Sequence, residues 1–490
     1  MTIVNQWKFI VLFTLSAMAA TVVNAQTFTT LVHFTGGNGG YPRSALTQGP
    51  DGRLYGTTTA GASNSVPLGK KTKMWGTLFA VDASGSLTTL ANFNGVNGRG
   101  SNQTPLLAAP NGTLFGGNTT FYQTSVDGKL RVLGQIPDSG FNGPMAEGID
   151  GSVYGVTLVG GDVGCGEDGC GAAYKVDPHG HVELLVTFAE GNNLTYPSGL
   201  MLGDDGNIYG ITGSPDEDSY GNVFKMTPGG VLTTLYNFCS EANCADGYDP
   251  FSLIQGTDGN FYGVAYEGGN YRNTCATYFL EPVGCGTIFR LSRSGVYTVL
   301  HTFCTDAPCS DGGNPSWLVE GSDGALYGVT QLDGDPSCNG GYGCGTIFKI
   351  TKDGAFTILY GFHTGDGQVP FGLTQATSGL FYGVQEVSPG VTCSLNEGQG
   401  CGTVFSFDIG LPPFVSVVRN FGRIGASDSI IGQGFIGATA VAFNGTPATF
   451  TVVSDTFLKT TIPQGATTGY VTVTTPSGVL TSNVQFHVIP

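Results

Sequence analysis

Apolar and small polar residues alternate in short stretches along most of the chain, and Asp-Gly or Asn-Gly pairs separate these stretches. Alternation with a period of two is typical of a strand with one buried face, and these dipeptides favour the tight turns of β-hairpins. Glycine is abundant, with 80 of 490 residues, and aromatic residues make up 11%. The pattern therefore predicts an all-β protein of many short strands and tight turns.

One hexapeptide pattern, Asp-Gly-x-Leu-Tyr-Gly or a close variant, occurs seven times. Its copies begin at Asp51, Asn111, Asp150, Asp205, Asp258, Asp323 and Ser378. Each copy opens a unit with further strand patterns: a glycine-led strand such as 286–289, a third strand such as 231–238, and a fourth opened by a proline such as Pro250. Four short antiparallel strands per unit are typical of a propeller blade. The repeats predict a seven-bladed β-propeller in which the Tyr-Gly strand comes first in each blade.

The two ends of the repeat array are incomplete. The seventh unit stops after its second strand, near residue 407, while the chain begins with a third strand pattern at 28–34 and a fourth at 44–48. We expect these N-terminal strands to complete the seventh blade, since closure removes exposed sheet edges. An open solenoid is the alternative, and it would need capping repeats.

The pattern changes after residue 410. A Pro412-Pro413 pair is followed by short strand patterns at roughly 8–12 residue spacing, which is typical of a small β-sandwich. The predicted domains are therefore a propeller at 26–410 and an immunoglobulin-like sandwich at 411–490.

The first 25 residues have the features of a signal peptide. Lys8 precedes an apolar stretch at 9–23, and Val23-Asn24-Ala25 is a small-residue cleavage site. The apolar stretch is shorter than the roughly 20 residues that a membrane helix needs, although a permanent anchor is the alternative. We expect a secreted, periplasmic or surface-associated monomer with no membrane span after cleavage.

The twelve cysteines fall into six close pairs. These are Cys165/Cys170, Cys239/Cys244, Cys275/Cys285, Cys304/Cys309, Cys338/Cys344 and Cys393/Cys401. An even number in an exported protein favours six local disulfides. Zinc is the alternative, but it prefers Cys-x-x-Cys pairs or nearby histidines. We therefore predict disulfides and no metal at these residues.

The charge of the chain excludes one class of partner. The formal net charge is −17, and only 11% of residues are charged. Nucleic-acid binding needs a basic stripe, which this sequence lacks. Nucleic acid is therefore not an expected partner.

The repeat resembles the Gloeobacter/Verrucomicrobia repeat of secreted bacterial proteins, through its Asp-Gly-x-Leu-Tyr-Gly and Gly-Thr-x-Phe patterns. The resemblance covers residues 28 to 408, implies an extracytoplasmic protein and carries no catalytic motif. Residues 432–435, 443–445 and 474–478 resemble an IPT/TIG immunoglobulin-like domain. With Arg419, Arg423 and Lys459 as its only basic residues, this domain is implied to act as a spacer rather than to bind DNA.

Copies five to seven of the repeat carry polar or aromatic side chains just after the Tyr-Gly pair. These are the candidate ligand-binding residues Tyr266, Glu267, Gln331, Asp333, Gln385 and Glu386. We expect this end of the first strand to converge on the central mouth, where propellers bind ligands. Glu267 and Glu386 are the candidate catalytic pair for glycoside hydrolysis, and solvated loop acids are the alternative.

Other residues suggest ligands less specifically. Trp75, Tyr122, Tyr266 and Tyr271 suit stacking on sugar faces, although packing between blades explains them equally well. The acidic loops 214–218 and 333–335 are candidate calcium sites, because oxygen-rich loops suit that ion. No cofactor is otherwise expected.

Three functions fit the sequence. The first is a secreted binding or adhesion scaffold that recognises carbohydrate or a cell-surface protein at the propeller face. The second is a polysaccharide-degrading enzyme, a hydrolase or a lyase, with its site at the propeller mouth. The third is a structural envelope component. The sequence favours the first.

Overall fold

The computed structural model describes residues 26–61, 66–68, 71–73, 75–100, 103–137, 140–161, 165, 168–189, 194–213, 220–269, 275, 284–306, 308–390, 393–395 and 400–489. The predicted signal peptide at residues 1–25, Tyr271 and the acidic loop 214–218 lie outside these residues. The part of the chain that the structure describes contains no helix with the length and apolar character that crossing a membrane requires.

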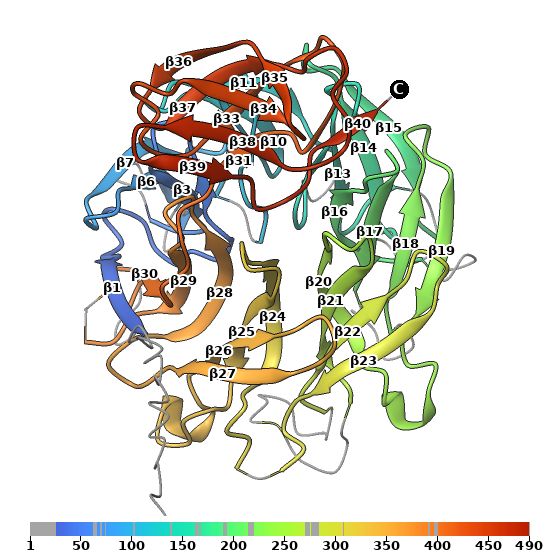
Figure 1. Cartoon of the computed structure of the whole chain (residues 1–490). Helices are drawn as coiled ribbons and strands as arrows, with labels where there is room; N and C mark the ends of the chain where they lie inside the picture. Colours follow the sequence, from blue (N-terminus) through green and yellow to red (C-terminus); the bar gives the residue numbers. More distant parts are fainter. Residues whose placement is uncertain are drawn as a thin grey trace, which may run out of the picture.

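The described residues confirm the all-β prediction. Seven four-stranded antiparallel sheets follow one another in a propeller-like ring, and a separate C-terminal region follows them (Figure 1). We number the sheets 1 to 7 in chain order of their innermost strands.

Each sheet has the same strand order from the centre of the ring outwards. The innermost strands are β2 (Thr47–Gln48), β8 (Leu107–Ala108), β12 (Ala146–Glu147), β16 (Pro197–Leu202), β20 (Tyr248–Gln255), β24 (Gly313–Glu320) and β28 (Gln368–Gln375). The second strands are β3 (Leu54–Thr58), β9 (Leu114–Gly117), β13 (Val153–Thr157), β17 (Ile208–Thr212), β21 (Phe261–Glu267), β25 (Leu326–Leu332) and β29 (Phe381–Val387). The third strands are β6 (Thr77–Val81), β10 (Thr120–Thr124), β14 (Ala172–Val176), β18 (Asn222–Met226), β22 (Thr287–Leu291), β26 (Thr346–Ile350) and β30 (Thr403–Asp408). The outermost strands are β7 (Leu87–Asn92), β11 (Leu130–Gln135), β15 (Val182–Thr187), β19 (Leu232–Asn237), β23 (Tyr297–Thr302), β27 (Phe356–Gly361) and β1 (Thr27–His33).

Two smaller features lie in the connections. Strands β4 (Val66–Leu68) and β5 (Lys71–Lys73) form a two-stranded hairpin between β3 and β6. Single turns of 3-10 helix occur at η2 (Ala242–Cys244) and η3 (Asn339–Gly341).

The strand order corrects the expected position of the Tyr-Gly strand. That strand is second in each sheet, and the proline-opened strand is innermost. Each proline-opened strand therefore begins a sheet rather than ending one. The sequence pattern could not distinguish the two positions, because a repeat has no marked beginning.

The closing sheet also differs from the prediction in detail. Sheet 7 takes three strands from the end of the array and one, β1, from the N-terminus, with Phe28 paired to Phe407. The expected second N-terminal strand at 44–48 is instead β2, the innermost strand of sheet 1. The two ends of the array are still joined within one sheet, since β1 occupies its outer edge.

Four pairs of neighbouring sheets meet through one recurring contact between a glycine and a proline. Gly286, just before β22, has φ +92°, and a Cβ added there would lie 2.5 Å from Pro315 Cδ of the next sheet. The same arrangement pairs Gly171 with Pro197, Gly221 with Pro250, and Gly402 with Pro42. Glycine is required because the next sheet's proline ring occupies the place of a side chain.

A hydrogen bond accompanies each of these contacts. Asn314 N, immediately before Pro315, donates to Cys285 O at 2.9 Å, and Asn314 has a left-handed φ of 55°. Equivalent bonds join Tyr41 N to Cys401 O, Tyr196 N to Cys170 O, and Asp249 N to Tyr220 O. The glycine, the proline and this bond together form what we call the sheet joint.

All six predicted disulfides are confirmed. Four of them include the cysteine that precedes the glycine of a third strand: Cys170, Cys285, Cys344 and Cys401. Because Cys170, Cys285 and Cys401 also supply carbonyls to sheet joints, these disulfides hold the loops against the next sheet.

The Asp-Gly turns are fixed by the tyrosine that follows them. Tyr209 Oη donates to Asp205 Oδ2 at 2.9 Å, and Lys225 Nζ lies 2.9 Å from the same oxygen. Tyr55, Tyr262 and Tyr327 make the same bond to the aspartates of their own turns. These aspartates therefore have structural partners, as expected if the Asp-Gly pairs form tight turns.

The C-terminal region has two four-stranded sheets, one two-stranded sheet and its own core. One sheet contains β31 (Ser416–Val417), β33 (Ser427–Ile431), β37 (Phe457–Thr461) and β36 (Phe450–Ser454). The other contains β35 (Thr446–Ala448), β34 (Ala440–Phe443), β38 (Val471–Thr475) and β39 (Gly478–Thr481), and β32 (Phe421–Arg423) pairs in parallel with β40 (His487–Ile489). A buried cluster that includes Ile430, Phe443, Val473 and Phe486 fills the space inside.

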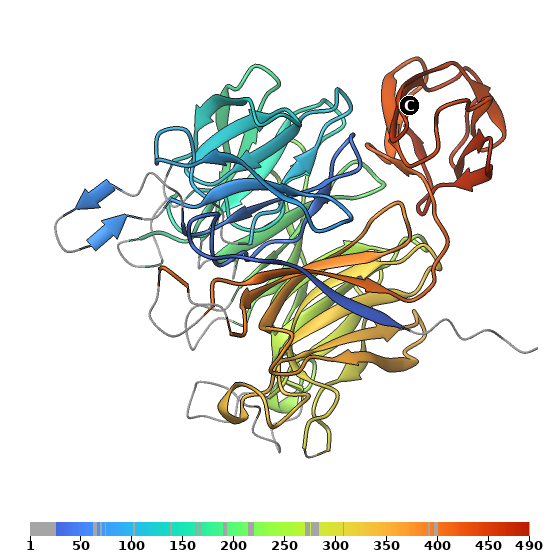
Figure 2. The same ribbon diagram turned by 90° about the vertical axis from the view of Figure 1, so that its left-hand side faces the viewer.

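The two ends of the ring differ in what they carry. We call the end with the Asp-Gly turns the turn face, and the end where the second strands finish, at Thr58, Thr212 and Glu267 for example, the loop face. The C-terminal region lies on the turn face: Thr456 Oγ1 donates to Pro50 O at 2.7 Å, and Ser429 Oγ to Pro110 O at 2.6 Å. Figure 2 shows this region (red) on the side of the ring opposite hairpin β4–β5.

The sheet joint predicts a specific mutational cost. Gly286→Ala should destabilise the protein by about 1–3 kcal/mol beyond the cost of its backbone strain, because its Cβ would overlap Ala265 O and Pro315 Cδ. Gly324→Ala is the matched control, since Gly324 has φ +78° but no atom within 4 Å of an added Cβ. That control should lose only about 1 kcal/mol. Equal losses in equilibrium denaturant unfolding would contradict the proposed role of the joint.

Candidate functional site

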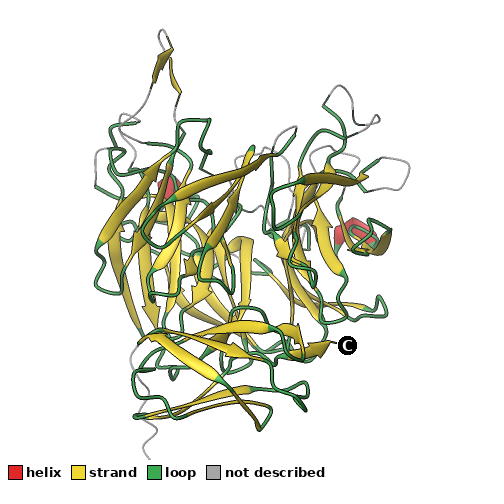
Figure 3. Cartoon of the chain, turned by 90° about the horizontal axis from the view of Figure 1, so that it is seen from above, coloured by secondary structure: helices red, strands yellow, loops and turns green. Residues whose placement is uncertain are grey.

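A cavity of about 490 Å³ lies at the centre of the ring. All seven innermost strands contribute to its wall. On the turn face, Val418, Arg419, Asn420, Phe421 and Asn483 of the C-terminal region also line it. Figure 3 shows the C-terminal sheets beside one end of the ring and the longer loops at the other. The loop face is therefore the end that the C-terminal region leaves uncovered.

The candidate residues of sheets 5 and 6 meet on the loop face. Tyr266 Oη donates to Gln331 Oε1 at 3.0 Å, and Asn314 Nδ2 donates to Tyr266 O at 3.1 Å. Gln331 is buried, while Tyr266 is half-buried and lies 5.7 Å from Phe251 between ring centroids. These side chains bridge the two sheets and form a preformed polar wall.

The candidate residues of sheet 7 have different environments. Glu386 forms an ion pair with Arg43, which follows the joint proline Pro42. Gln385 is fully buried and accepts a hydrogen bond from Thr403 Oγ1 at 2.8 Å. Thr58 and Thr330 occupy the equivalent position in other sheets and bond Thr77 and Thr346 in the same way. Gln385 therefore takes part in sheet pairing, and its side chain does not reach the surface.

Glu267 is a half-buried carboxylate at the end of β21. Burial raises its pKa above the usual value, although a hydrogen bond with the side chain of Tyr248, its partner on β20, opposes this shift. Glu267 is therefore a partly desolvated acid with a side-chain partner, not a freely solvated one.

Glu267 and Glu386 belong to sheets that are not neighbours. Glu267 ends the second strand of sheet 5 and Glu386 lies on the second strand of sheet 7, with sheet 6 between them. Glu386 is also neutralised by Arg43. The structure therefore gives each of these two carboxylates its own partner, and their role as a catalytic pair stays a prediction.

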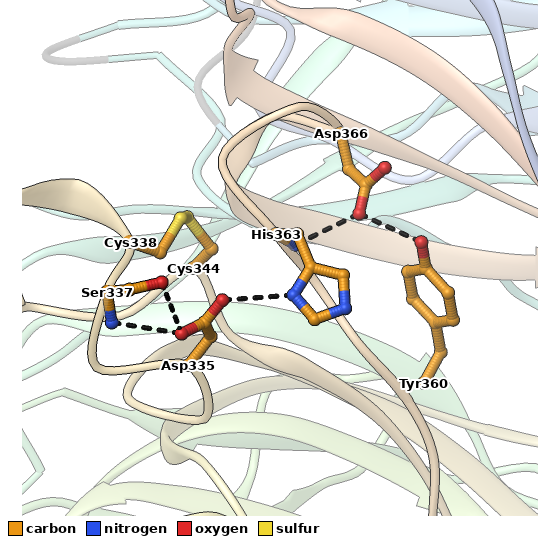
Figure 4. Close-up of a disulfide and its surroundings, with 7 residues drawn as sticks. All are labelled: Asp335, Ser337, Cys338, Cys344, Tyr360, His363 and Asp366. Atoms are coloured by element: carbon orange, nitrogen blue, oxygen red, sulfur yellow. Dashed lines mark hydrogen bonds and ion pairs between the residues drawn. A yellow bond between two sulfur atoms is a disulfide. The ribbon is translucent and has the colours of Figure 1, made fainter.

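The candidate calcium loop at 333–335 is held by protein contacts (Figure 4). Asp335 Oδ2 lies 3.0 Å from His363 Nδ1, and Ser337 Oγ donates to Asp335 Oδ1 at 2.7 Å. The hydrogen bond from His363 is the main reason that the pKa of Asp335 is lowered to about 2. The disulfide Cys338–Cys344 closes the same loop. Both oxygens of Asp335 thus have partners, and calcium here stays a prediction.

Cysteine sulfur atoms gather at one place among the described residues. Cys285 lies within 4.8 Å of Cys304 and Cys309, and also of Cys275 and Asp333. All four cysteines are disulfide-bonded. Because metal binding by cysteine needs the thiolate, this cluster is structural in its oxidised form.

The structure places one aromatic candidate in the core and shows one further exposed tyrosine. Tyr122 is buried against Phe93, so its ring belongs to the core. Tyr220 was not among the candidates, yet it is 42% exposed on the loop face, and its ring lies edge-on to Tyr248 at 5.9 Å. Tyr220 stands just before Gly221, where four other sheets have a disulfide cysteine. The replacement of this cysteine by tyrosine in one copy of the repeat is the sequence feature that could have identified Tyr220.

The repeat assigns the chain to a family. The model of the Gloeobacter/Verrucomicrobia repeat matches residues 140–405 and 243–447, together more than half of the sequence. The chain belongs to this family. No curated protein matches it significantly.

Solved structures resemble the chain in fold alone. A streptogramin B lyase is 15% identical, with 78% of this chain and 97% of that chain covered and a TM-score of 0.50. The virginiamycin B lyase from Staphylococcus aureus is 13% identical, with 78% and 99% covered and a TM-score of 0.50. A fungal alcohol oxidase of the AA5 family, in complex with copper, is 13% identical, with 96% and 100% covered and a TM-score of 0.52. The match to the oxidase extends over nearly the whole chain.

Buried charged residues lie where the C-terminal region meets the ring. Arg419 forms an ion pair with Glu147 at the end of β12. Asp428 is 2% exposed and accepts hydrogen bonds from Ser429 N at 2.7 Å and Arg419 N at 3.4 Å. Burial raises the pKa of Asp428 to about 7.

This shift predicts how stability depends on pH. The folded protein holds the Asp428 proton more tightly than the unfolded chain, so the free energy of unfolding should fall as pH rises from about 4 to about 7. Asp428→Asn should flatten this slope and stabilise the protein at pH 8 by about 1 kcal/mol or more. Asp455→Asn, at an exposed position of the same region, is the control for loss of a charge. Identical slopes for the wild type and Asp428→Asn in unfolding series would contradict the assignment.

Proposed function

We propose that the protein is exported and acts as a rigid binding module that recognises carbohydrate through the loop face of a seven-bladed β-propeller. In this proposal residues 1–25 are a cleaved signal peptide, and the C-terminal region is an IPT/TIG immunoglobulin-like spacer. Six disulfides support an oxidising compartment, where such bonds persist.

The observation that carries the proposal is the cluster of Tyr220, Tyr248 and Glu267 on the loop face. An exposed tyrosine ring offers an apolar face to the C–H side of a sugar, and a carboxylate accepts hydrogen bonds from sugar hydroxyls. Tyr248 fixes both partners, since it contacts the ring of Tyr220 and the carboxyl group of Glu267. The cluster is therefore preorganised, which lowers the entropic cost of binding.

Polysaccharide cleavage is the second candidate function. The raised pKa of Glu267 suits a general acid, but hydrolysis needs a second carboxylate nearby, and Glu386 is paired with Arg43 in another sheet. An enzyme would release oligosaccharides that mass spectrometry detects, and Glu267→Gln would abolish the release while retaining the polysaccharide. A binding module would retain the polysaccharide without products.

Retention on immobilised polysaccharides tests the binding proposal. Tyr220→Ala should weaken retention on the bound polysaccharide about tenfold, which corresponds to about 1.4 kcal/mol for the lost stacking. Tyr470→Ala is the matched control, because Tyr470 is 41% exposed but lies in the C-terminal region. No retention on any polysaccharide, or equal loss in both variants, would contradict carbohydrate binding and leave an extracellular protein as the ligand to test.

A further inference from the structure

We infer that the central cavity is a second binding site, which takes a neutral and mainly apolar small molecule that carries a hydrogen-bond acceptor and a donor. This inference is independent of the proposed function, because the cavity wall is built from the innermost strands and the C-terminal region. The Tyr220 cluster does not contribute to it.

The size and wall of the cavity suit a small organic ligand. Its volume of about 490 Å³ lies within the range of about 300–1,000 Å³ that is usual for such sites. Most of the wall is apolar, with Leu106, Met145, Leu200, Phe251, Trp317 and Phe421 among its residues. Such a wall gains free energy when an apolar molecule displaces water from it.

Three buried polar atoms of the wall add specificity. Among the described residues, Ser198 Oγ, Arg419 Nε and Asn483 Oδ1 are buried and have no hydrogen-bond partner. Arg419 and Asn483 belong to the C-terminal region, whereas Ser198 lies on β16 of the ring. A buried polar group without a partner costs about 1–3 kcal/mol, so a ligand that supplies an acceptor to Arg419 and a donor to Asn483 would recover this cost.

The charges of the wall favour a neutral ligand. Glu147, Glu320 and Arg419 are the acidic and basic residues that line the cavity. Glu147 is paired with Arg419, and Glu320 with Lys352 at 2.6 Å. Because each carboxylate already has a cation, a charged ligand would lose its hydration without gaining a counter-ion.

The test uses the full chain and N-phenyl-1-naphthylamine, a neutral two-ring amine that fluoresces in apolar sites. We expect saturable binding of one probe per chain, with energy transfer from Trp317. The sulfonated relative 1-anilinonaphthalene-8-sulfonate is the charge control and should bind at least about tenfold more weakly. Lack of saturable binding of the neutral probe would overturn the inference, and equal binding of the sulfonate would overturn its claim of neutrality.

Variants locate the probe. Met201→Trp should fill part of the cavity and weaken binding at least about tenfold, while Val231→Trp, at a 64% exposed position, should not change it. Trp317→Phe keeps Trp75 and should abolish energy transfer with little change in affinity. Energy transfer that persists in Trp317→Phe would place the probe elsewhere and contradict the inference, even if Met201→Trp did not fold.

Discussion

The packing of a proline ring against a glycine at the joints between sheets is the constraint on which the ring depends. The glycine at each such joint has no room for a side chain, and the residue before the proline adopts a left-handed backbone to deliver its amide to the preceding sheet. The joint thereby explains three features of the repeat: the glycine before the third strand, the proline at or near the start of the innermost strand and the cysteines beside the glycine. Loops anchored by these cysteines form the loop face.

A second set of contacts divides the turn face into two halves. In four sheets the last side chain of the innermost strand accepts a hydrogen bond from a backbone N–H of the preceding sheet. The donors and acceptors are Thr377 N and Gln48, Asp204 N and Gln255, Thr257 N and Glu320, and Ser322 N and Gln375. The equivalent residues of sheets 2, 3 and 4 are Ala108, Glu147 and Leu202, as strand register shows. Ala108 and Leu202 cannot make this bond, and Glu147 binds Arg419 instead. The C-terminal region contacts sheets 1, 2 and 3, so it fastens two of the three sheets that lack this bond, and it covers one end of the cavity.

Much of this architecture could be predicted from the sequence because it repeats. The strands, the turns and all six disulfides follow from local patterns, since each joins residues close in the chain. The order of strands within a sheet could not be predicted, because the Tyr-Gly and proline-opened strands alternate without a marked start. Among the site residues, Tyr266 and Gln331 meet as neighbours, whereas Gln385 is buried by a pairing with Thr403 that only strand register reveals. Tyr220 and Arg419 were missed because their partners, Tyr248 and Glu147, lie far from them in the sequence or in another sheet.

Hydrogen exchange of the full chain tests most directly whether the C-terminal region fastens the ring. A variant with Arg419, Ser429 and Thr456 changed to Ala would lose the three side-chain contacts to sheets 1 to 3. The account predicts faster amide exchange in the β2–β3, β8–β9 and β12–β13 hairpins, with β20–β21, β24–β25 and β28–β29 unchanged. Uniform acceleration around the ring, or none in the first three hairpins, would contradict it.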